Sequence, residues 1–168
     1  MNIGINDISI RTELRSGDIG HVVLLHGLLY SNEYGYGLSF ESYVAGGLHE
    51  FYKNFDKEKD CAWICEYKKE IIGFMVLMHR ENNSAQLRYF IIQENFRGIG
   101  LGKKLMDLFM TFLKEKKYKS AYLQTTSELP AAASLYKRYG FKLTDEFPSD
   151  AFGKQVIQQR YDLTDILL

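Results

Sequence analysis

The chain reads Arg97-Gly98-Ile99-Gly100-Leu101-Gly102 where an apolar, strand-like segment gives way to an amphipathic helical segment. A glycine-rich turn that opens a helix leaves several backbone N–H groups without a partner, and the positive end of the helix dipole lies beside them. Because glycine has no Cβ, an anion can approach this backbone closely. The stretch therefore predicts a binding site for a phosphate or pyrophosphate group.

The spacing of the glycines excludes two common nucleotide-binding motifs. A P-loop reads G-x-x-x-x-G-K-[ST], but Arg97 stands where its first glycine should be, and Lys104 stands where Ser or Thr should be. A dinucleotide fingerprint reads G-x-G-x-x-G, whereas Gly98, Gly100 and Gly102 give G-x-G-x-G. A nucleotide-binding protein of another kind is therefore the least favoured function.

The run does match R-x-x-G-x-G, and with this motif the chain resembles the GNAT family of acetyl-coenzyme A-dependent N-acetyltransferases. That family carries the motif between its fourth strand and third helix, and the match extends over residues 87–92 and 101–105. A second match, over residues 135–141, resembles the family's Leu-Tyr-x-x-x-Gly-Phe segment. The resemblance implies the GNAT fold, an α/β (α+β) architecture with a mixed, mostly antiparallel sheet of about seven strands and about four helices.

Hydrophobic periodicity predicts alternating helices and strands along a single domain that covers residues 1–168. Pro130 is expected in the first turn of the last helix, where its missing N–H matters little, and Gly140 is expected to end that helix. Strands are predicted over residues 8–11, 62–67, 71–78, 85–93, 118–125, 141–147 and 155–163, the last two as an antiparallel pair. Helices are predicted over residues 18–30, after a cap at Ser39, from Leu101, and from about Pro130.

Composition indicates a compact globular protein and argues against several partners. With 168 residues, 46% hydrophobic and 25% charged, the chain is ordinary for one folded domain. Its 21 basic and 21 acidic residues balance, so neither nucleic acid nor a membrane surface is expected as a partner. The amino terminus lacks the pattern of a secretory signal, and the longest apolar run, residues 71–78, is too short to span a bilayer. A cytoplasmic location is expected.

The two cysteines, Cys61 and Cys65, are predicted to be core residues. They stand four positions apart in a strand-like stretch, so both point to one face, which is a poor arrangement for a disulfide. No second Cys/His pair stands at the spacing of a zinc finger. No metal is therefore predicted.

The family resemblance implies acetyl-coenzyme A as the cosubstrate. The strand before the motif would pack in the core, while its backbone over residues 90–92 would pair with the pantetheine amides, as an added strand does. Lys103 and Lys104 have two equal interpretations, as partners of the coenzyme phosphates and as ordinary solvated charges. The expected coenzyme-binding residues are Phe90, Ile91, Ile92, Arg97, Gly98, Ile99, Gly100, Leu101, Gly102, Lys103 and Lys104.

Tyr136 is the predicted general acid. Its apolar neighbours, among them Ala132 and Leu135, would by themselves favour a packing role. Its place in the second family match implies instead that its hydroxyl lies near the coenzyme sulfur and protonates the departing thiolate. Because a phenol is a weak acid, positioning must supply most of the benefit.

The general base is where this sequence departs from the family's pattern. Histone-type members carry a catalytic glutamate at the position of Gln86, and glutamine cannot take a proton there. Leu129 also stands where many members have an asparagine that binds pantetheine. The candidates for the base are Glu33, Glu128 and a chain of water molecules, although Glu33 is also interpreted as a solvated loop carboxylate. The residues expected to border the acceptor are Tyr30, Glu33, Tyr34 and Gln86, and His26 is expected to be packed or capping.

Two functions from different classes lead. The favoured one is an enzyme that moves acetyl from acetyl-coenzyme A directly to the primary amine of a small molecule or peptide. The alternative is a non-catalytic acyl-coenzyme A sensor, which Gln86 and Leu129 favour and Tyr136 disfavours.

Residues 25–35, 153–154 and 159–161 also resemble the acetyltransferase half of bacterial fusions of a MarR-type winged helix with a GNAT domain. No winged helix is expected here, because the first predicted strand begins close to Met1. The acceptor amine and a homodimer are left open.

Overall fold

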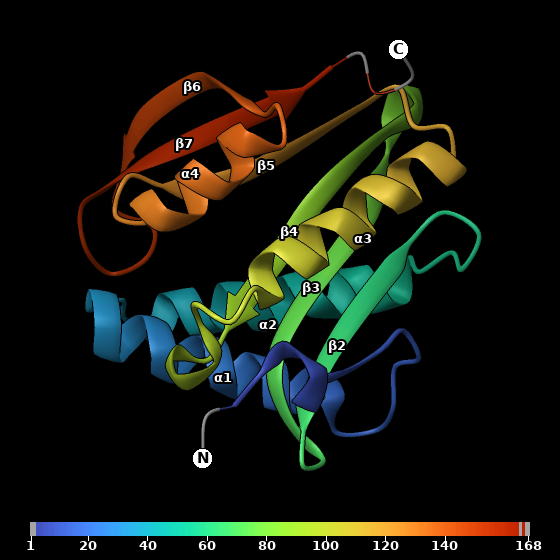
Figure 1. Ribbon diagram of the computed structural model, residues 1–168. Helices are drawn as coiled ribbons and strands as arrows, with labels where there is room; N and C mark the ends of the chain where they lie inside the picture. The colour runs from blue at the N-terminus through green and yellow to red at the C-terminus, as the bar shows by residue number, and fades with distance from the viewer. Residues whose placement is uncertain (1–2, 165, 167–168) are drawn as a thin grey trace.

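The structure is a computed structural model that describes residues 3–164 and 166, and it contains a seven-stranded sheet with helices on both faces (Figure 1). The strand order is β1-β2-β3-β4-β5-β7-β6, and every neighbouring pair is antiparallel except β4 with β5. The predicted fold class is thus confirmed. The strands are β1 (Ser9–Arg11), β2 (Cys61–Tyr67), β3 (Glu70–Arg80), β4 (Ser84–Ile92), β5 (Ser120–Thr126), β6 (Lys142–Ser149) and β7 (Val156–Leu163). The helices are α1 (Asp18–Tyr34), α2 (Leu38–Lys53), α3 (Leu101–Glu115) and α4 (Pro130–Arg138), with short 3-10 segments η1 (Ile5–Asp7), η2 (Glu81–Asn83) and η3 (Glu94–Phe96).

Alternating side chains along the strands divide the core into two layers. Helices α1 and α2 cover one face of the sheet, and α3 and α4 lie on the other (Figure 1). In β2, Trp63 lies in the layer beneath α3, whereas its neighbour Ile64 lies in the layer beneath α1 and α2. Cys61 and Cys65 are buried and free in the same layer as Trp63, so their predicted role as core residues is confirmed.

Strands β4 and β5 pair over a short stretch and then separate (Figure 1). Residues 84–87 pair with residues 120–123, and beyond Leu87 the β5 side of β4 has no strand partner in the described chain. β4 also carries a bulge, where Tyr89 has a φ of 53° and the register with β3 shifts. Because of the bulge, Arg88 and Tyr89 are both on the side of the sheet that faces α2. The split and the bulge together form the floor of the site described below.

Helix α1 is longer than its apolar periodicity predicts, which corrects the expected place of two candidate residues. The periodicity ends at Tyr30, but the helix continues through Glu33 and Tyr34 and ends at Gly35, whose φ is 70°. Polar residues do not stop a helix, so the left-handed glycine is the true end signal. Glu33 and Tyr34 therefore lie on the last turn of α1 and not in a loop.

The other helix ends follow local signals, with one exception. Pro130 is the first residue of α4, and Gly140, with a φ of 90°, follows its carboxyl end as predicted. The prediction of Ser39 as the cap of α2 is wrong, because that helix begins at Leu38. Its N-cap is Gly37, whose backbone is extended. Gly37 has no side chain, so no side-chain hydrogen bond caps the first turn of the helix.

Candidate active site

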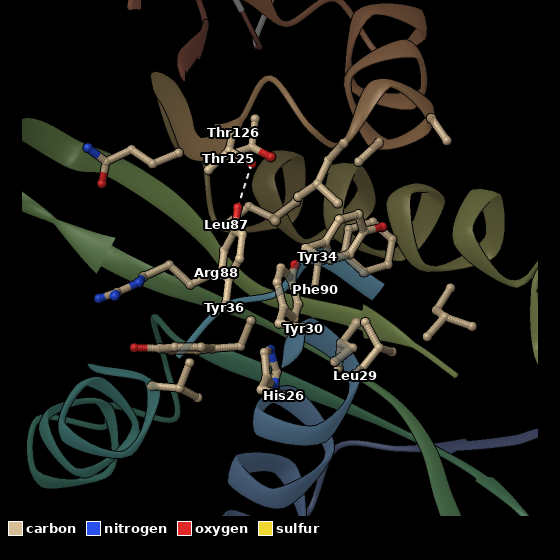
Figure 2. A pocket seen from close by; sticks show the side chains of 18 of the residues that line it. His26, Leu29, Tyr30, Tyr34, Tyr36, Leu87, Arg88, Phe90, Thr125 and Thr126 are labelled. Carbon is tan, nitrogen blue, oxygen red and sulfur yellow. Dashed lines mark hydrogen bonds between the residues drawn. The ribbon is translucent and has the colours of Figure 1, made fainter. Parts of the chain in front are cut away.

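A pocket of about 440 Å³ lies where β4 and β5 separate. Its walls come from α1, α2 and their connection on one side, from β4 and β5, and from the start of α4 on the other side. Figure 2 shows Tyr30, Tyr34 and Tyr36 gathered around this space, which Phe90 of β4 also lines. We call its two parts the loop end, which residues 97–103 border and Arg97, Gly98 and Gly102 line, and the aromatic end, at Tyr30, Tyr36, Phe40, Tyr43 and Phe152.

The loop end presents a row of backbone donors. Helix α3 begins at Leu101 after Gly100, and its first backbone hydrogen bond runs from the Lys104 N–H to the Gly100 carbonyl at 3.0 Å. In the part of the chain that the structure describes, no group accepts a hydrogen bond from the six N–H groups of residues 98–103. Such free donors at a helix start form a binding arrangement for an anion.

The glycines keep the space in front of these donors open. Gly98 and Gly100 have φ values of 77° and 90°, which side chains rarely adopt. A Cβ added at either position would meet no atom within 4 Å. A phosphate-sized group therefore has room to reach the backbone.

The predicted coenzyme-binding residues fall into two groups. Leu101 is buried in the core, whereas Lys103 and Lys104 are exposed, and Lys103 pairs with Asp107 at 3.0 Å. These residues, with Ile99 and Gly100, do not line the pocket. Residues 99, 100, 101 and 103 can offer an anion their free backbone N–H groups, whereas the Lys104 N–H is bonded to the Gly100 carbonyl and Lys104 can offer its side chain. Those that do line it are Phe90, Ile91, Ile92, Arg97, Gly98 and Gly102.

Arg97 joins the loop end to the last turn of α1. Its guanidinium donates to both carboxylate oxygens of Glu33, at 2.8 Å each, and its Nε donates to the Ile92 carbonyl at 3.0 Å. These paired hydrogen bonds lower the pKa of Glu33 and raise the pKa of Arg97. The Glu33 carboxylate is thus ionised and engaged, and Glu33 does not line the pocket.

Tyr136 lines the pocket from α4. Its side chain is 5% exposed, with the rings of Phe90, Phe141 and Tyr161 each 6.3 Å away between centroids. Its hydroxyl has no hydrogen-bond partner within the described residues. Burial raises the pKa of Tyr136, so the hydroxyl keeps its proton at neutral pH. It can therefore donate to a ligand atom in the pocket.

Gln86 is a buried polar residue of the pocket floor. It is 4% exposed, and its Oε1 accepts two hydrogen bonds from the Arg80 guanidinium, at 2.9 and 2.7 Å. Because that oxygen is used, the amide nitrogen is the group left to contact a ligand. Gln86 can donate a hydrogen bond there but cannot take up a proton.

The aromatic end is a cluster of touching rings. Ring centroids of Tyr30 and Phe40 are 4.5 Å apart, those of Tyr36 and Phe40 are 5.0 Å apart, and those of Phe40 and Phe152 are 5.1 Å apart. Burial raises the pKa of Tyr30, and it raises the pKa of Tyr36 to about 12. These phenols are therefore uncharged at neutral pH, and the wall they form is apolar with hydroxyl groups at its edges.

Hydrogen bonds fasten this end of the pocket. The Tyr36 hydroxyl is 2.9 Å from Oγ1 of Thr126 on β5, as the dashed line in Figure 2 shows. The Gly37 N–H donates to the Phe152 carbonyl at 2.9 Å, which ties the β6–β7 connection to the α1–α2 connection. The two connections therefore hold the aromatic rings in fixed places.

Glu128, the other carboxylate considered as a base, is held outside the pocket. Its Oε1 accepts from Nζ of Lys154 at 2.5 Å, and the same Nζ donates to the Tyr34 carbonyl at 2.7 Å. Its Oε2 is buried without a partner in the described chain. Glu128 is not among the residues that line the pocket.

His26 is packed, as predicted, but it also forms part of the pocket wall. Its Nδ1 lies 2.8 Å from the Val22 carbonyl one turn earlier, so Nδ1 carries the proton. Burial lowers the pKa of His26 to about 4. The ring is therefore neutral at pH 7, and it stacks on Tyr30 with centroids 6.0 Å apart.

Local sequence patterns do not identify most of the aromatic end. Its residues come from four segments of the chain, namely α1, the α1–α2 connection, α2 and the β6–β7 connection, and no spacing rule links them. The one local signal is the run Tyr34-Gly35-Tyr36-Gly37, whose glycines mark a sharp connection between helices. Pocket residues that the sequence analysis missed include Tyr36, Phe40, Tyr43, Arg88, Gln124, Thr126, Phe152 and Gln158.

Residues 3–164 and 166 contain neither a cluster of metal ligands nor a helix that could span a membrane. Within them, no group of three or more His, Cys, Asp or Glu side chains could hold a metal ion. None of the helices in that part is long and apolar enough to cross a membrane.

One family profile and several curated proteins match this chain. The profile of the acetyltransferase (GNAT) family matches residues 29–141. The uncharacterized N-acetyltransferase YjgM of Escherichia coli K12 is 32% identical over 101 residues, 58% of this chain and 60% of that protein. The N-acetylaspartate synthetase of Danio rerio is 30% identical over 87 residues, 51% of this chain and 31% of that protein. The matched part thus spans less than two thirds of either relative.

Solved structures share the fold at low sequence identity. An acetyltransferase of the GNAT family from Staphylococcus aureus Mu50 has a TM-score of 0.74 at 19% identity, covering 94% of this chain and 98% of that one. A GNAT family acetyltransferase from Elizabethkingia anophelis with acetyl-CoA bound has a TM-score of 0.66 at 18% identity, covering 95% and 99%. The family profile covers more than half of the sequence and both predicted motifs. This chain belongs to the GNAT acetyltransferase family.

Proposed function

We propose that this protein transfers an acetyl group from acetyl-coenzyme A to a primary amine. The observation that carries the proposal is the row of free N–H groups over residues 98–103, beside a pocket that also contains Tyr136. Family membership and the neighbour with acetyl-CoA bound support it. The name of the zebrafish relative, N-acetylaspartate synthetase, supports an amine as the group acetylated.

Backbone groups would hold most of the coenzyme. Its pyrophosphate would accept hydrogen bonds from residues 98–103, and its pantetheine amides would pair with the free edge of β4 at residues 90–92. Lys104, which is exposed and has no ion pair within the described chain, is available to the phosphates. Arg97 would position the loop, because Glu33 already engages its guanidinium.

The proposed reaction is a direct attack with both substrates bound. The amine nitrogen forms a bond to the thioester carbonyl carbon, the carbon–sulfur bond breaks, and Tyr136 gives its proton to the leaving sulfur. Backbone N–H groups at the free edge of β4 would polarise the carbonyl. The extra proton on the nitrogen passes to water, and water later returns a proton to Tyr136.

Water, rather than a carboxylate, is the proposed acceptor of the amine proton. Glu33 is bound by Arg97, whose hydrogen bonds lower its pKa and weaken it as a base. Glu128 is bound by Lys154. Neither carboxylate lines the pocket, and Gln86 cannot accept a proton.

A second candidate is a non-catalytic acyl-coenzyme A sensor. It is favoured by Gln86, whose oxygen is taken up by Arg80 at the position where related enzymes carry a glutamate. An assay of purified protein with acetyl-coenzyme A and a panel of primary amines separates the two. Thiol release matched by acetylated amine in mass spectra supports the enzyme. Tight coenzyme binding without release supports the sensor, and no binding overturns both.

Several wider features are also proposals. We propose that residues 1–168 form one GNAT domain in the cytoplasm, with no nucleic-acid or membrane partner, and that the chain is related to the acetyltransferase half of MarR–GNAT fusions. The balanced charge supports the absence of a nucleic-acid or membrane partner. The segments at residues 25–35 and 153–154 support the relation to the fusion proteins. A homodimer is a further proposal, which sedimentation equilibrium would test.

A further inference from the structure

The aromatic end of the pocket carries a positive charge that no acidic side chain balances. Of the described residues that line the pocket, none is Asp or Glu, and the two with a fixed charge are Arg88 and Arg97. Arg97 is paired with Glu33 at 2.8 Å. Arg88 has no carboxylate within ion-pair distance in the described chain. An anion is therefore the natural partner of Arg88.

Arg88 is held in place but keeps most of its donors. Its Nη2 donates to the Tyr43 hydroxyl at 2.8 Å, and its guanidinium lies over the rings of Tyr89 and Tyr43, 4.7 and 5.5 Å from the centroids. A guanidinium has five N–H donors, so four have no partner within the described residues. A planar group stacked on aromatic rings with free donors suits bidentate binding of a carboxylate.

Two features of the backbone near Arg88 allow its side chain to lie against the rings of Tyr89 and Tyr43. Tyr89 has a φ of 53°, which places Arg88 and Tyr89 side by side on one face of the sheet. Gly47 of α2 gives both side chains room. A Cβ there would lie 1.9 Å from the Tyr89 hydroxyl and 3.3 Å from Nη2 of Arg88. Two local features of the chain thus accommodate the same cation.

Arg88 is also far from the donors proposed for the coenzyme phosphates. In the register with β3, Arg88 pairs with Val76 and Ile92 pairs with Gly73, so the bulged segment between them advances by three strand positions, or roughly 10 Å. In Figure 2 its side chain extends away from Tyr34 and Leu29, which lie at the other side of the pocket. The charge of Arg88 therefore acts on the acceptor and not on the phosphates.

We propose that the acceptor is a small amine that carries a carboxylate, and that Arg88 binds this carboxylate. The inference rests on the proposed acetyl transfer and names its substrate class. The carboxylate accepts two hydrogen bonds from the free side of the guanidinium, which leaves the amine to approach the thioester. A polyamine or an aminoglycoside is disfavoured, because its several cations would meet Arg88 without an acidic side chain in the wall.

Matched acceptors test the proposal. Aspartate and asparagine differ by a side-chain carboxylate, and alanine and alaninamide differ by the α-carboxylate, while spermidine represents a polycation. Both kcat/KM and the dissociation constant of each acceptor, the latter by calorimetry in the presence of coenzyme A, should be measured. The carboxylate member of at least one pair should be favoured by roughly 10- to 100-fold, the usual weight of a charge-assisted hydrogen bond.

Variants assign that preference to one side chain. Arg88→Gln should bring the preferred pair to within about 3-fold of each other, and Arg88→Lys should give an intermediate ratio because its charge is not planar. Arg15→Gln is the control, since Arg15 is an exposed cation before the start of α1 and does not line this pocket. It should keep the wild-type ratio. Unchanged circular dichroism would verify that each variant is folded.

Binding and turnover separate the two proposals. A carboxylate preference in binding that Arg88→Gln abolishes supports this inference, even where no acetyl is transferred, and such absence of transfer would count against the enzyme alone. Equal binding of both members of both pairs, no binding of any acceptor, or tighter binding of spermidine overturns it. A preference that survives in Arg88→Gln overturns it as well.

Discussion

The loop end and the aromatic end of the pocket are built from different parts of the polypeptide. At the loop end, the binding groups are backbone N–H groups, set by Gly98 and Gly100 and by the start of α3. At the aromatic end, they are side chains of α1, the α1–α2 connection, α2 and the β6–β7 connection, packed ring against ring, with Arg88 of β4 beside them. The first end presents partial positive charge, and the second presents apolar surface with the fixed charge of Arg88.

Because of this difference, the two ends should tolerate different kinds of substitution. A backbone site depends on conformation, so it fails when a glycine is replaced and is largely indifferent to neighbouring side chains. A side-chain site depends on the identity of each residue and on the packing that holds it. The loop end therefore suits a constant ligand, and the aromatic end can be retuned for a particular acceptor.

The largest effect is expected where the two ends meet, at Tyr136. Tyr136→Phe removes the hydroxyl alone, and kcat should fall by roughly 10²- to 10⁴-fold if that group protonates the leaving thiolate. The KM for acetyl-coenzyme A should change little, because the lost interaction grows mainly in the transition state. Steady-state kinetics with the best acceptor checks both values.

Tyr118→Phe is the matched control for this prediction. Tyr118 is buried, and its hydroxyl donates to the Lys59 carbonyl at 2.7 Å outside the pocket. This variant should keep its turnover rate although it loses a hydrogen bond. An unchanged turnover rate in Tyr136→Phe, with acyl transfer limiting the rate, would remove Tyr136 from the mechanism.

The second effect tests whether the loop end is a backbone site. Gly100→Asp puts a carboxylate in front of the free donors, and the affinity for acetyl-coenzyme A should fall by about 100-fold or more through repulsion of the phosphates. Gly17→Asp is the control, because Gly17 is also an N-cap glycine with positive φ, 97°, and open space around it. Both variants should lose roughly 1–2 kcal/mol of stability from the left-handed conformation. Equal coenzyme affinity in the two variants, by calorimetry, would contradict the loop site.

The third effect concerns the aromatic end and its buried imidazole. The pKa of His26 is about 4 in the folded protein and 6.5 when unperturbed, so the unfolded chain binds more protons between these pH values. Stability should therefore fall as pH drops from 6.5 to about 4, by on the order of 3 kcal/mol from this group. The free energy of unfolding, measured with urea at several pH values, should therefore change less steeply with pH in His26→Gln than in the wild type. The exposed His49→Gln should retain the wild-type slope, and equal slopes in all three proteins would refute the assignment.

The smallest effect distinguishes two roles for Glu33. If Glu33 only holds Arg97, Glu33→Gln should change the KM for acetyl-coenzyme A by less than about 5-fold, because partly exposed ion pairs contribute roughly 1 kcal/mol or less. The turnover rate of this variant should stay near that of the wild type. If the turnover rate instead drops by about two orders of magnitude, the size of a general-base contribution, Glu33 is the general base.

The sequence predicts the loop end well because its chemistry is local. R-x-x-G-x-G places three glycines and a helix start within six residues, and the same short range fixes the free N–H groups. The strand and helix order could also be predicted, because periodicity and glycine or proline signals are local. The roles of Tyr136 and of the individual coenzyme contacts stay predictions.

The aromatic end could not be predicted, because tertiary packing assembles it. Phe152 meets Phe40 only when the β6–β7 connection folds back onto α2, more than a hundred positions earlier in the chain. The expected place of Glu33 between two helices was wrong, because the spacing of apolar residues cannot show that a helix continues through a last turn of polar residues. Its pairing with Arg97 depends on how α1 docks beside the loop.

Amide hydrogen exchange tests the central claim, that acetyl-coenzyme A binds to the backbone of residues 98–103. Without ligand these six N–H groups lack partners in the described chain, so they should exchange fast. Saturating acetyl-coenzyme A should slow them by at least about 10-fold, while the first turn of α1 after Gly17, a helix start outside the pocket, should not change. Unchanged exchange over residues 98–103, with the coenzyme shown by calorimetry to be bound, would contradict the account.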